Sequence, residues 1–345
     1  MSKKKKKIII GIFIFLVLAG TMTAYFAYKI IFTNNISSSA PSIIYIKTGS
    51  TYVQVIDILE KNNVVNDIRT FKLVSKWKKY PQKIKAGRYA VEQGMNNNEL
   101  VNMLRSGRQE AVNFTFNNIR TKEQLVKKVS QYLETQPDSL LSFLNNLQEI
   151  EKYNVNTENV LTIFIPNTYQ LWWNTNPSEF TQRMYREYQK FWTEERMQKA
   201  SEINLSPTEV IILASIVEEE NHRSDEQSRI AGVYINRLKK NIPLQADPTV
   251  KFALNDFERK RLLYADLKIN SPYNTYKYSG LPPGPIRIPS PQCIDNVLNY
   301  EKHNYIFMCA KEDFSGYHNF AATSREHSAN AKKYHKALNK RKIKK

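Results

Sequence analysis

An apolar run near the start of the chain constrains the fold more than any other stretch. Residues 8–28 carry no charged side chain and directly follow five consecutive lysines at 3–7. At a helical rise of ~1.5 Å per residue such a run spans ~31 Å, which matches the hydrocarbon core of a bilayer. We therefore predict one membrane-spanning helix. The positive-inside rule then places the lysines in the cytoplasm and everything after Lys29 outside the cell membrane.

A cleaved signal peptide is the alternative interpretation of this segment. Against it, the apolar run is longer than a usual h-region, and only a poor Ala-x-Ala-like pattern occurs, around residues 24–27. We expect residues 1–32 to form a basic cytoplasmic tip and a retained single-pass anchor in the cytoplasmic (inner) membrane.

The charge of the chain limits its classes of partner. The formal net charge is +19, and the lysines at 3–7 together with a basic tail at 339–345 account for ten of these charges. The body between them is also basic, but no RNA- or DNA-binding signature accompanies the charge, so we predict no nucleic-acid partner. A wall polymer or an anionic membrane surface would also favour a basic protein.

The rest of the chain is long enough for one small and one larger domain. Residues 33–42 contain a Ser-rich stretch with a proline, which is typical of a flexible linker. Residues 43–110 mix short strand and helix patterns and predict a small α+β domain. Residues 111–338 are then expected to form a larger α+β domain, in which residues 114–120 predict a strand. Within the small domain the strand patterns cover 43–46 and 87–91, and the helix patterns cover 51–61, 68–79 and 98–104.

Residues 206–220 predict a helix that is buried on all sides yet ends in three glutamates. Ser206 can serve as its N-cap, Pro207 fits the first helical position, and Glu209 can close a capping box. The following residues are apolar on nearly every side, so this helix should lie in the core. A second capping box at 224–227 predicts the start of another helix, so the first helix must end before it.

Glutamates at the end of a buried helix suit acid–base chemistry. The negative end of the helix dipole disfavours their ionised form, and neighbouring carboxylates and apolar surroundings also raise the pKa. A carboxyl group that stays protonated near neutral pH can act as a general acid. The alternative is a solvated glutamate run where a core helix reaches the surface, and the local pattern alone favours that alternative.

Five blocks of sequence, taken together, favour a catalytic glutamate over a solvated glutamate run. They are Leu213–Glu220, Val233–Leu238, Leu244–Thr249, Ser271–Tyr276 and Gly280–Pro285. No single block is specific, but together they resemble the YceG-like family of endolytic murein transglycosylases. The resemblance runs from about the membrane segment to His335. It implies that residues 43–110 are a LysM-like domain that holds glycan, and that residues 111–338 are the catalytic domain.

The resemblance implies different roles for the glutamates. Residues two positions apart on a helix point ~200° apart, so only one of Glu218 and Glu220 can face a given cleft. The family motif is Glu-x-Glu at this place, and its catalytic carboxylate aligns with Glu220. We expect Glu218 to be a structural partner of Arg229 or Arg237. The intervening Glu219 is expected to be solvated.

The other blocks are expected to bind substrate, with Asn236 as a supporting residue. The expected substrate-binding residues are Gln245, Asp247, Thr249, Tyr273, Asn274, Thr275, Tyr276 and His318. Residues 273–276 offer the aromatic faces, amides and hydroxyls that sugar recognition requires, and they also fit a tight turn after Pro272. His318 is about equally a structural histidine.

The resemblance implies a reaction that needs one carboxyl group. Ordinary glycosidases use two carboxylates, whereas Glu220 would protonate the glycosidic oxygen and then take the proton of the sugar's own C6 hydroxyl. This predicts cleavage of the MurNAc-β-1,4-GlcNAc bond in nascent peptidoglycan strands to 1,6-anhydro-MurNAc ends. Such an enzyme would terminate glycan elongation near penicillin-binding synthases. The alternatives are a muramidase that uses Asp247 as its second carboxylate, and a non-catalytic wall-binding or synthase-scaffolding protein.

The sequence predicts neither a metal site nor a cofactor site, and it differs from the family pattern at one position. The histidines and the two cysteines form no His-Glu-x-x-His or Cys-x-x-Cys pattern, so we expect no metal and no cofactor. Cys293 and Cys309 could pair outside the cytoplasm, although two reduced cysteines are the favoured alternative. Asn167 stands where the family usually has an acidic residue, so we assign it no chemical role.

Overall fold

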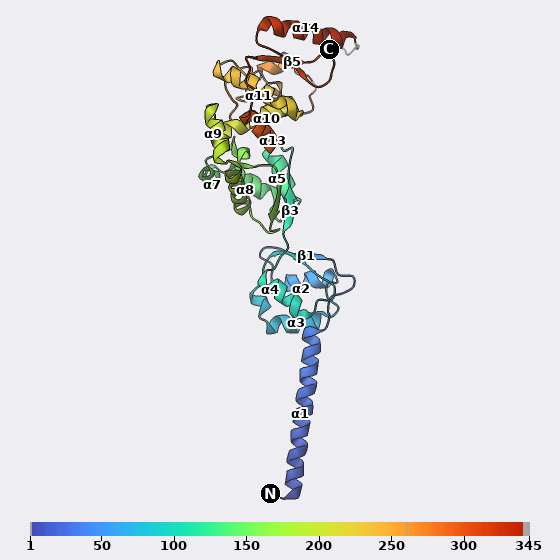
Figure 1. The fold of residues 1–345 in the computed structure, drawn as a ribbon. Helices are drawn as coiled ribbons and strands as arrows, with labels where there is room; N and C mark the ends of the chain where they lie inside the picture. The colour runs from blue at the N-terminus through green and yellow to red at the C-terminus, as the bar shows by residue number, and fades with distance from the viewer. Residues whose placement is uncertain (1, 260, 341–345) are drawn as a thin grey trace. The chain divides into compact units, whose positions relative to one another are not determined.

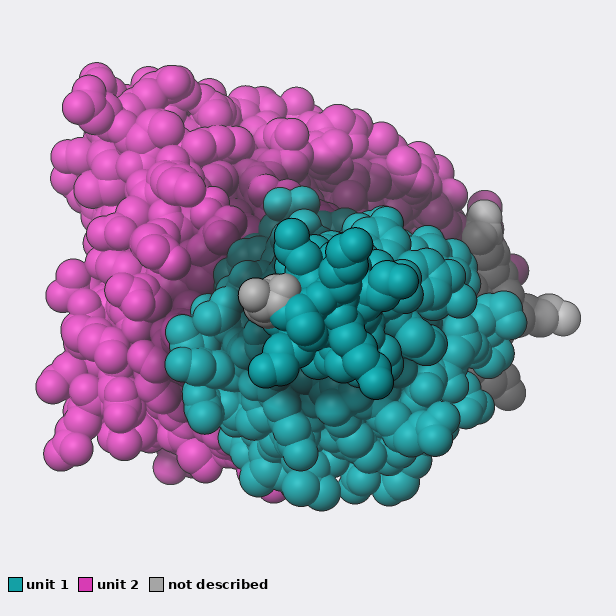
Figure 2. All heavy atoms as spheres, turned by 90° about the horizontal axis from the view of Figure 1, so that it is seen from below, with its two compact units in different colours: residues 1–113, 132–134, 170–175 teal, residues 114–131, 135–169, 176–345 magenta. Residues whose placement is uncertain are grey.

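The computed structural model describes residues 2–259 and 261–340, in which helices and short paired strands both occur, as predicted (Figure 1). The chain divides into two compact units, which are coloured separately in Figure 2. Unit 1 comprises residues 1–113, 132–134 and 170–175, and unit 2 comprises residues 114–131, 135–169 and 176–345. Each unit is described by itself below. Of the basic tail predicted at 339–345, residues 341–345 lie outside the described residues.

The predicted apolar segment forms α1 (Lys3–Phe32), one unbroken helix in Figure 1. Ser2 caps its N-terminus by accepting a hydrogen bond from the Lys5 backbone N–H. None of the residues of α1 is buried. Among the described residues, α1 is the one unbroken helix that is long and apolar enough to cross a membrane.

Unit 1 continues with a two-stranded antiparallel sheet and three amphipathic helices. β1 pairs with β2 so that Ile43 lies opposite Ala90 and Ile46 opposite Gly87. The elements are β1 (Ile43–Ile46), α2 (Tyr52–Lys61), α3 (Ile68–Trp77), η1 (Tyr80–Gln82), β2 (Gly87–Ala90) and α4 (Asn97–Ser106). Thr51 and Asn96 form capping boxes at the starts of α2 and α4. These bounds follow the sequence patterns to within two residues.

The segment at 33–42, which the composition predicts as a flexible linker, is in part fixed against unit 1. The Asn35 side chain donates to Asn97 Oδ1 at 2.7 Å and to the backbone oxygen of Asp67 at 3.0 Å. Ile36 is 2% exposed and belongs to the core of the unit. Backbone contacts add to these: Ile36 forms an isolated bridge with Val65, and the Ser37 N–H donates to the Val64 oxygen at 3.0 Å. Partners distant in the sequence therefore order a segment whose composition predicts a linker.

Unit 2 is mainly helical. Its helices are α5 (Lys122–Ser130), α6 (Pro137–Asn145), α7 (Leu147–Ile150), α8 (Pro177–Phe191), α9 (Glu194–Glu202), α10 (Pro207–Glu220), α11 (Ser224–Lys239), α12 (Asp247–Ala253), α13 (Pro291–Leu298) and α14 (Ser324–Lys340). Short 3-10 helices are η2 (Glu151–Tyr153), η3 (Val160–Ile163) and η4 (Asp266–Lys268). Within unit 2, β5 (Phe307–Ala310) pairs antiparallel with β6 (His318–Ala321). The strand β3 (Val112–Thr115) pairs with β4 (Thr168–Leu171), and the residues of these two strands are divided between the units.

The core of unit 2 is built around α10, as the sequence predicts. Residues 210–217 are all buried, and α10 packs against α9, α11, α12 and α13. Ser206 Oγ accepts from the Glu209 N–H, and Glu209 Oε2 accepts from the Ser206 N–H at 2.8 Å, so the predicted capping box is confirmed. Packing of this apolar helix therefore fixes where its last turn, with its three glutamates, emerges.

Two local predictions in this region are wrong. The start of α11 is capped by Arg223 without a side-chain hydrogen bond, and Ser224 is the first helical residue. Gln227, which the predicted box would pair with Ser224, instead donates to the Asn221 backbone oxygen and accepts from the Asn296 amide, each at 2.9 Å, because tertiary partners compete with the helix terminus. The strand predicted at 114–120 begins earlier and ends at Thr115, before Asn118 with its left-handed φ of 51°.

Candidate active site

A pocket of about 350 Å³ opens beside the end of α10 in unit 2. Its lining comes from α10, α11, α12, β5, β6 and α14, together with the loop that carries Tyr276. Of the residues predicted from the sequence, the structure brings five into this lining: Glu220, Gln245, Asp247, Tyr276 and His318. Segments almost a hundred residues apart thus meet around one glutamate.

Glu220 is the last residue of α10 and is partly buried. The Tyr234 hydroxyl donates to Glu220 Oε1 at 2.6 Å. Burial raises the pKa of Glu220 to about 7, and the negative charge of Asp247 acts in the same direction. The Tyr234 hydrogen bond and the positive charges of His318 and Lys251 act the other way. The direction and the effect of burial agree with the prediction, whereas the neighbouring negative charge comes from Asp247 rather than from Glu218 and Glu219.

Glu218 and Glu219 do not share the surroundings of Glu220, because each contacts partners that were not predicted from the sequence. Glu218 Oε2 accepts the Ser290 N–H at 2.8 Å and lies 3.6 Å from Arg287 Nε. Glu219 Oε1 lies 2.9 Å from Arg120 Nε and 3.0 Å from Arg287 Nη1. The prediction that Glu219 is solvated is therefore wrong. Partly enclosed carboxylates need cationic partners, and the guanidinium of Arg287 lies beside both of these glutamates.

The partners predicted for Glu218 are engaged elsewhere. Arg229 pairs with Glu301 at 2.8 Å. The buried guanidinium of Arg237 donates to Gln245 Oε1 at 2.6 Å and to two backbone oxygens, those of Pro243 and Ile306. Gln245 has a left-handed φ of 52°, so Arg237 holds this strained turn at the pocket wall.

Asp247 and Tyr276 form a second pair in the pocket. The Tyr276 hydroxyl donates to Asp247 Oδ1 at 2.5 Å. Burial and the Asp247 carboxylate raise the pKa of Tyr276, so the phenol stays a donor at neutral pH. Asp247 is therefore a charge fixed near Glu220, with one of its oxygens already committed.

Three residues predicted to bind substrate lie in the interior instead. Thr249, Asn274 and Thr275 are at most 1% exposed. Thr249 Oγ1 and Thr275 Oγ1 are 2.9 Å apart, and Asn274 donates to the backbone oxygens of Leu267 and Ile269. These side chains hold the loops that carry Asp247 and Tyr276, which agrees with the alternative interpretation of a tight turn.

Two further predicted residues lie outside the Glu220 pocket. Tyr273 lines a separate pocket of about 250 Å³, and its hydroxyl donates to Glu158 Oε2 at 3.4 Å. Asn236 donates to the backbone oxygens of His303 and Tyr305, at 2.7 and 3.0 Å, just before β5. A supporting role for Asn236 is consistent with these bonds.

His318 enters the pocket from the start of β6. Its Nδ1 lies 2.8 Å from Glu226 Oε2, and its backbone N–H donates to Glu226 Oε1 at 2.9 Å. Burial acts to raise the pKa of Glu226, but the hydrogen bonds from His318 and Asn221 hold it below its usual value. Glu226 is therefore a buried carboxylate, and the capping pattern at 224–227 gave no sign of this partner.

The described residues offer no metal-binding alternative to this arrangement. Within residues 2–259 and 261–340, no group of three or more His, Cys, Asp or Glu side chains is placed to hold a metal ion. Cys293 is buried, with its Sγ 3.3 Å from the Ala214 backbone oxygen, and neither it nor Cys309 forms a disulfide.

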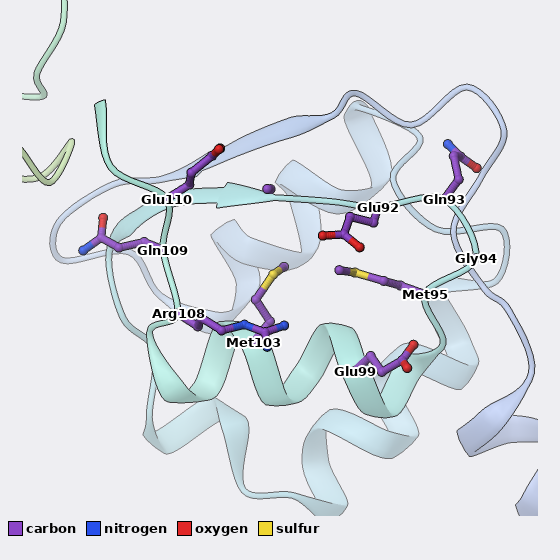
Figure 3. A pocket seen from close by; sticks show the side chains of 10 residues that line it. Glu92, Gln93, Gly94, Met95, Glu99, Met103, Arg108, Gln109 and Glu110 are labelled. Carbon is purple, nitrogen blue, oxygen red and sulfur yellow. The ribbon is translucent and has the colours of Figure 1, made fainter. Parts of the chain in front are cut away.

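Unit 1 has its own pocket, of about 780 Å³, between the end of β2 and α4 (Figure 3). Glu92, Met95 and Met103 point toward one another across it, and Arg108 and Glu110 border it. The described residues that line this pocket include no aromatic ring. Its polar lining could bind a polar polymer, but it contains no buried titratable group with a proton donor such as the Glu220–Tyr234 pair.

The Glu220 pocket contains a carboxyl group whose pKa is raised to about 7, which is the kind of group that general acid–base catalysis requires. A model of the YceG-like family matches residues 44–333, and the chain belongs to this family. A Bacillus subtilis (strain 168) relative named endolytic murein transglycosylase is 29% identical over 319 residues, which cover 86% of each chain.

Two further comparisons agree with the family. A Streptococcus pneumoniae (strain D39) relative of the same name is 27% identical over 339 residues, covering 88% of this chain but 61% of its own length. The 2.6 Å crystal structure of a putative yceG-like protein from Listeria monocytogenes matches with a TM-score of 0.54 at 25% identity. That match covers 83% of this chain and 97% of the solved one.

Proposed function

We propose that this protein is a membrane-anchored endolytic lytic transglycosylase of peptidoglycan, with Glu220 as both acid and base. The observation that carries the proposal is the carboxyl group of Glu220, whose pKa burial raises to about 7 in an open, polar-lined pocket. Such a group is protonated often enough to act as an acid and ionised often enough to act as a base. The names of the relatives support murein as the substrate.

The reaction needs one proton carrier. Protonated Glu220 gives its proton to the oxygen that links C1 of N-acetylmuramic acid to N-acetylglucosamine, and the C1–O bond breaks. The C6 hydroxyl of the same muramic acid then attacks C1, and its proton passes to the Glu220 carboxylate. A C1–O6 bond replaces the C1–O4 bond, no water is consumed, and the enzyme regains its starting state. The attacking hydroxyl is intramolecular, which compensates for the missing second carboxylate.

The neighbours of Glu220 fit this cycle. Burial and the Glu220 charge raise the pKa of Tyr234, so its hydroxyl remains a donor to Oε1 throughout. The other oxygen, Oε2, is left to carry the transferable proton. Asp247 raises the pKa of Glu220 and shares a hydrogen bond with Tyr276, which suits a residue that tunes the acid and positions the sugar. Gln245 and His318 complete the proposed substrate contacts.

Analysis of the reaction products tests this proposal. The detergent-solubilised full-length protein is incubated with purified peptidoglycan, and the fragments are identified by mass spectrometry. The proposal expects 1,6-anhydro-MurNAc ends, with cuts inside the strands. Reducing ends alone would instead make the protein a muramidase, in which Asp247 is the second carboxylate. Binding without any fragments would favour a wall-binding or scaffolding protein.

We propose that the remaining parts of the chain bring the catalytic unit to growing strands. α1 would be a retained anchor with residues 3–7 in the cytoplasm, and the fold of residues 43–110 would be a LysM-like glycan-binding domain. Such an anchor would place the enzyme near penicillin-binding synthases, where it would terminate strand elongation. Intact-mass analysis of the protein extracted from membranes tests the anchor, because a mature chain beginning near residue 28 would contradict it.

A further inference from the structure

The proposed reaction leaves one buried carboxylate without a role. Glu226, on the first turn of α11, is 4% exposed, and both of its oxygens accept hydrogen bonds. Oε1 accepts the His318 backbone N–H at 2.9 Å, while Oε2 accepts from His318 Nδ1 at 2.8 Å and from the Asn221 amide at 2.5 Å. Burying a charge is costly, so such a group stays only where its partners compensate for lost hydration.

The same carboxylate connects two walls of the Glu220 pocket. Asn221 directly follows Glu220, and its backbone N–H closes the end of α10 on the Val217 oxygen at 3.2 Å. Its side-chain amide also donates to the Gly316 oxygen, just ahead of β6. Glu226 therefore joins the chain immediately after the catalytic residue to the histidine on the facing strand.

These bonds decide which edge of the His318 ring can meet a ligand. With Nδ1 at 2.8 Å from a carboxylate, Nδ1 carries the proton and donates. His318 also lines the pocket that holds Glu220. Nε2 is the ring nitrogen left for substrate, and the orientation of the ring about its side-chain torsions is set by Glu226.

We propose that Glu226 is a positioning residue that holds His318 so that Nε2 contacts a hydroxyl group of the sugar beside the bond that Glu220 cleaves. This inference rests on the proposed function and assigns no direct contact between Glu226 and substrate. A sugar hydroxyl can donate and accept, so it suits Nε2 in either protonation state of the ring.

A double-mutant cycle in the full-length protein tests whether Glu226 acts through His318. Glu226→Gln replaces an oxygen acceptor with an amide donor, so one of its two bonds to His318 is lost. We expect Glu226→Gln and His318→Ala each to lower kcat for anhydro-end formation by about 10- to 100-fold. The double variant should be no slower than the slower single variant. Losses that multiply in the double variant would overturn the inference.

Asp225→Asn is the matched control. Asp225 neighbours Glu226, and its Oδ2 accepts a hydrogen bond at 2.9 Å from Tyr317, the neighbour of His318. Neither residue of this control pair lines the pocket. We expect its kcat to stay within about twofold of wild type. A loss as large as that of Glu226→Gln would show that the Glu226–His318 contact only joins α11 to the β5–β6 hairpin. That result would overturn a positioning role for Glu226.

A spectroscopic readout separates positioning from stability. The ¹⁵N shifts of the His318 ring should report a protonated Nδ1 in the wild type and a change of tautomer or protonation in Glu226→Gln. A slow Glu226→Gln with wild-type His318 shifts would contradict the inference. If this variant does not fold, His318→Asn serves instead, because the asparagine amide can still donate to Glu226 but has no atom in the place of Nε2. Full activity in His318→Asn would overturn the inference.

The outcomes also separate this inference from the proposed function. If the wild type makes anhydro ends and Glu220→Gln does not, the proposed function stands. An unaffected His318→Ala would then overturn only the role given to Glu226. If the wild type makes no anhydro ends, the failure lies in the proposed function itself.

Discussion

Each unit of this protein has an open pocket with carboxyl groups at its wall, yet only the pocket of unit 2 contains an enclosed carboxyl group with a raised pKa. In unit 1, Glu99 and Glu110 line the pocket (Figure 3). Glu99 accepts the Asn96 N–H at 3.0 Å in a helix cap, and Glu110 accepts from Arg88 at 2.6 Å with its side chain about half exposed. In unit 2, Glu220 is enclosed and accepts from a neutral phenol. Burial and the nearby Asp247 carboxylate raise the pKa of Glu220, whereas Glu110 is exposed to solvent beside an arginine.

The same contrast exists within the last turn of α10. Glu218 and Glu219 lie beside Arg287 and Arg120, and Glu220 lies beside Tyr234. Three identical side chains in succession therefore divide into two that lie beside arginines and one that accepts a hydrogen bond from a phenol. Burial in the pocket and the partners of each side chain, rather than the residue type, therefore distinguish these three carboxyl groups.

Glu220→Gln should cause the largest effect. It keeps the shape and a hydrogen-bonding group but removes the transferable proton, so both steps lose their catalyst. We expect anhydro-end formation to fall by about 10²- to 10⁴-fold or more, measured by mass spectrometry of digested peptidoglycan. Glu99→Gln in the unit 1 pocket is the matched control and should leave kcat unchanged. A folded Glu220→Gln with wild-type turnover would end the assignment.

Arg287→Gln should cause the largest loss of stability. It leaves the carboxylates of Glu218 and Glu219 short of a cation in an enclosed site, so we expect the free energy of unfolding to drop by about 3–5 kcal/mol. Chemical denaturation monitored by circular dichroism measures this drop. The control is Arg229→Gln, whose exposed pair with Glu301 should cost about 0–1 kcal/mol. Equal losses in both variants would contradict the account of the last turn of α10.

Glu92→Arg tests whether the unit 1 pocket binds glycan. Glu92 points into the pocket in Figure 3, so a longer cationic side chain should fill it. We expect the dissociation constant for purified peptidoglycan to rise by about tenfold, or about 1.4 kcal/mol, with kcat unchanged. The same change at Glu60, which pairs with Lys72 outside this pocket, should leave binding intact. Unchanged binding in Glu92→Arg would remove the role proposed for this pocket.

Asp247→Asn should cause the smallest effect, seen mainly in the pH profile. The negative charge of Asp247 favours the protonated form of Glu220, so removing it lowers the pKa of Glu220 from about 7. Activity that needs protonated Glu220 falls as the pH rises through this pKa, so the alkaline limb should move to lower pH. The kcat measured against pH should show this displacement, with anhydro ends still formed. A shift to higher pH would contradict the electrostatic role, and loss of all products would favour the muramidase alternative.

Local patterns in the sequence determined much of the framework. A run of uncharged residues after five lysines is enough to predict α1, and a capping box before an apolar run is enough to predict α10. The strand at Ile43–Ile46 was predicted with the bounds that the structure gives. These features depend on residues within one or two helical turns of one another, or on period-two alternation, so they can be read without knowing the fold. Glu220 itself was selected by the resemblance to a family, since the glutamate run alone favoured a solvated surface.

Tertiary structure decided the partners of every charged group in the site. Arg287 reaches Glu218 and Glu219 from almost seventy residues away, and His318 reaches Glu226 from more than ninety. It also buried Thr249, Asn274 and Thr275, which read as equally good sugar ligands. Ion pairs and pKa values depend on distances and on enclosure by other elements, and a linear pattern contains neither. The sequence could therefore name the helix that carries the acid, while only the packing around that helix determined which carboxyl group keeps its proton.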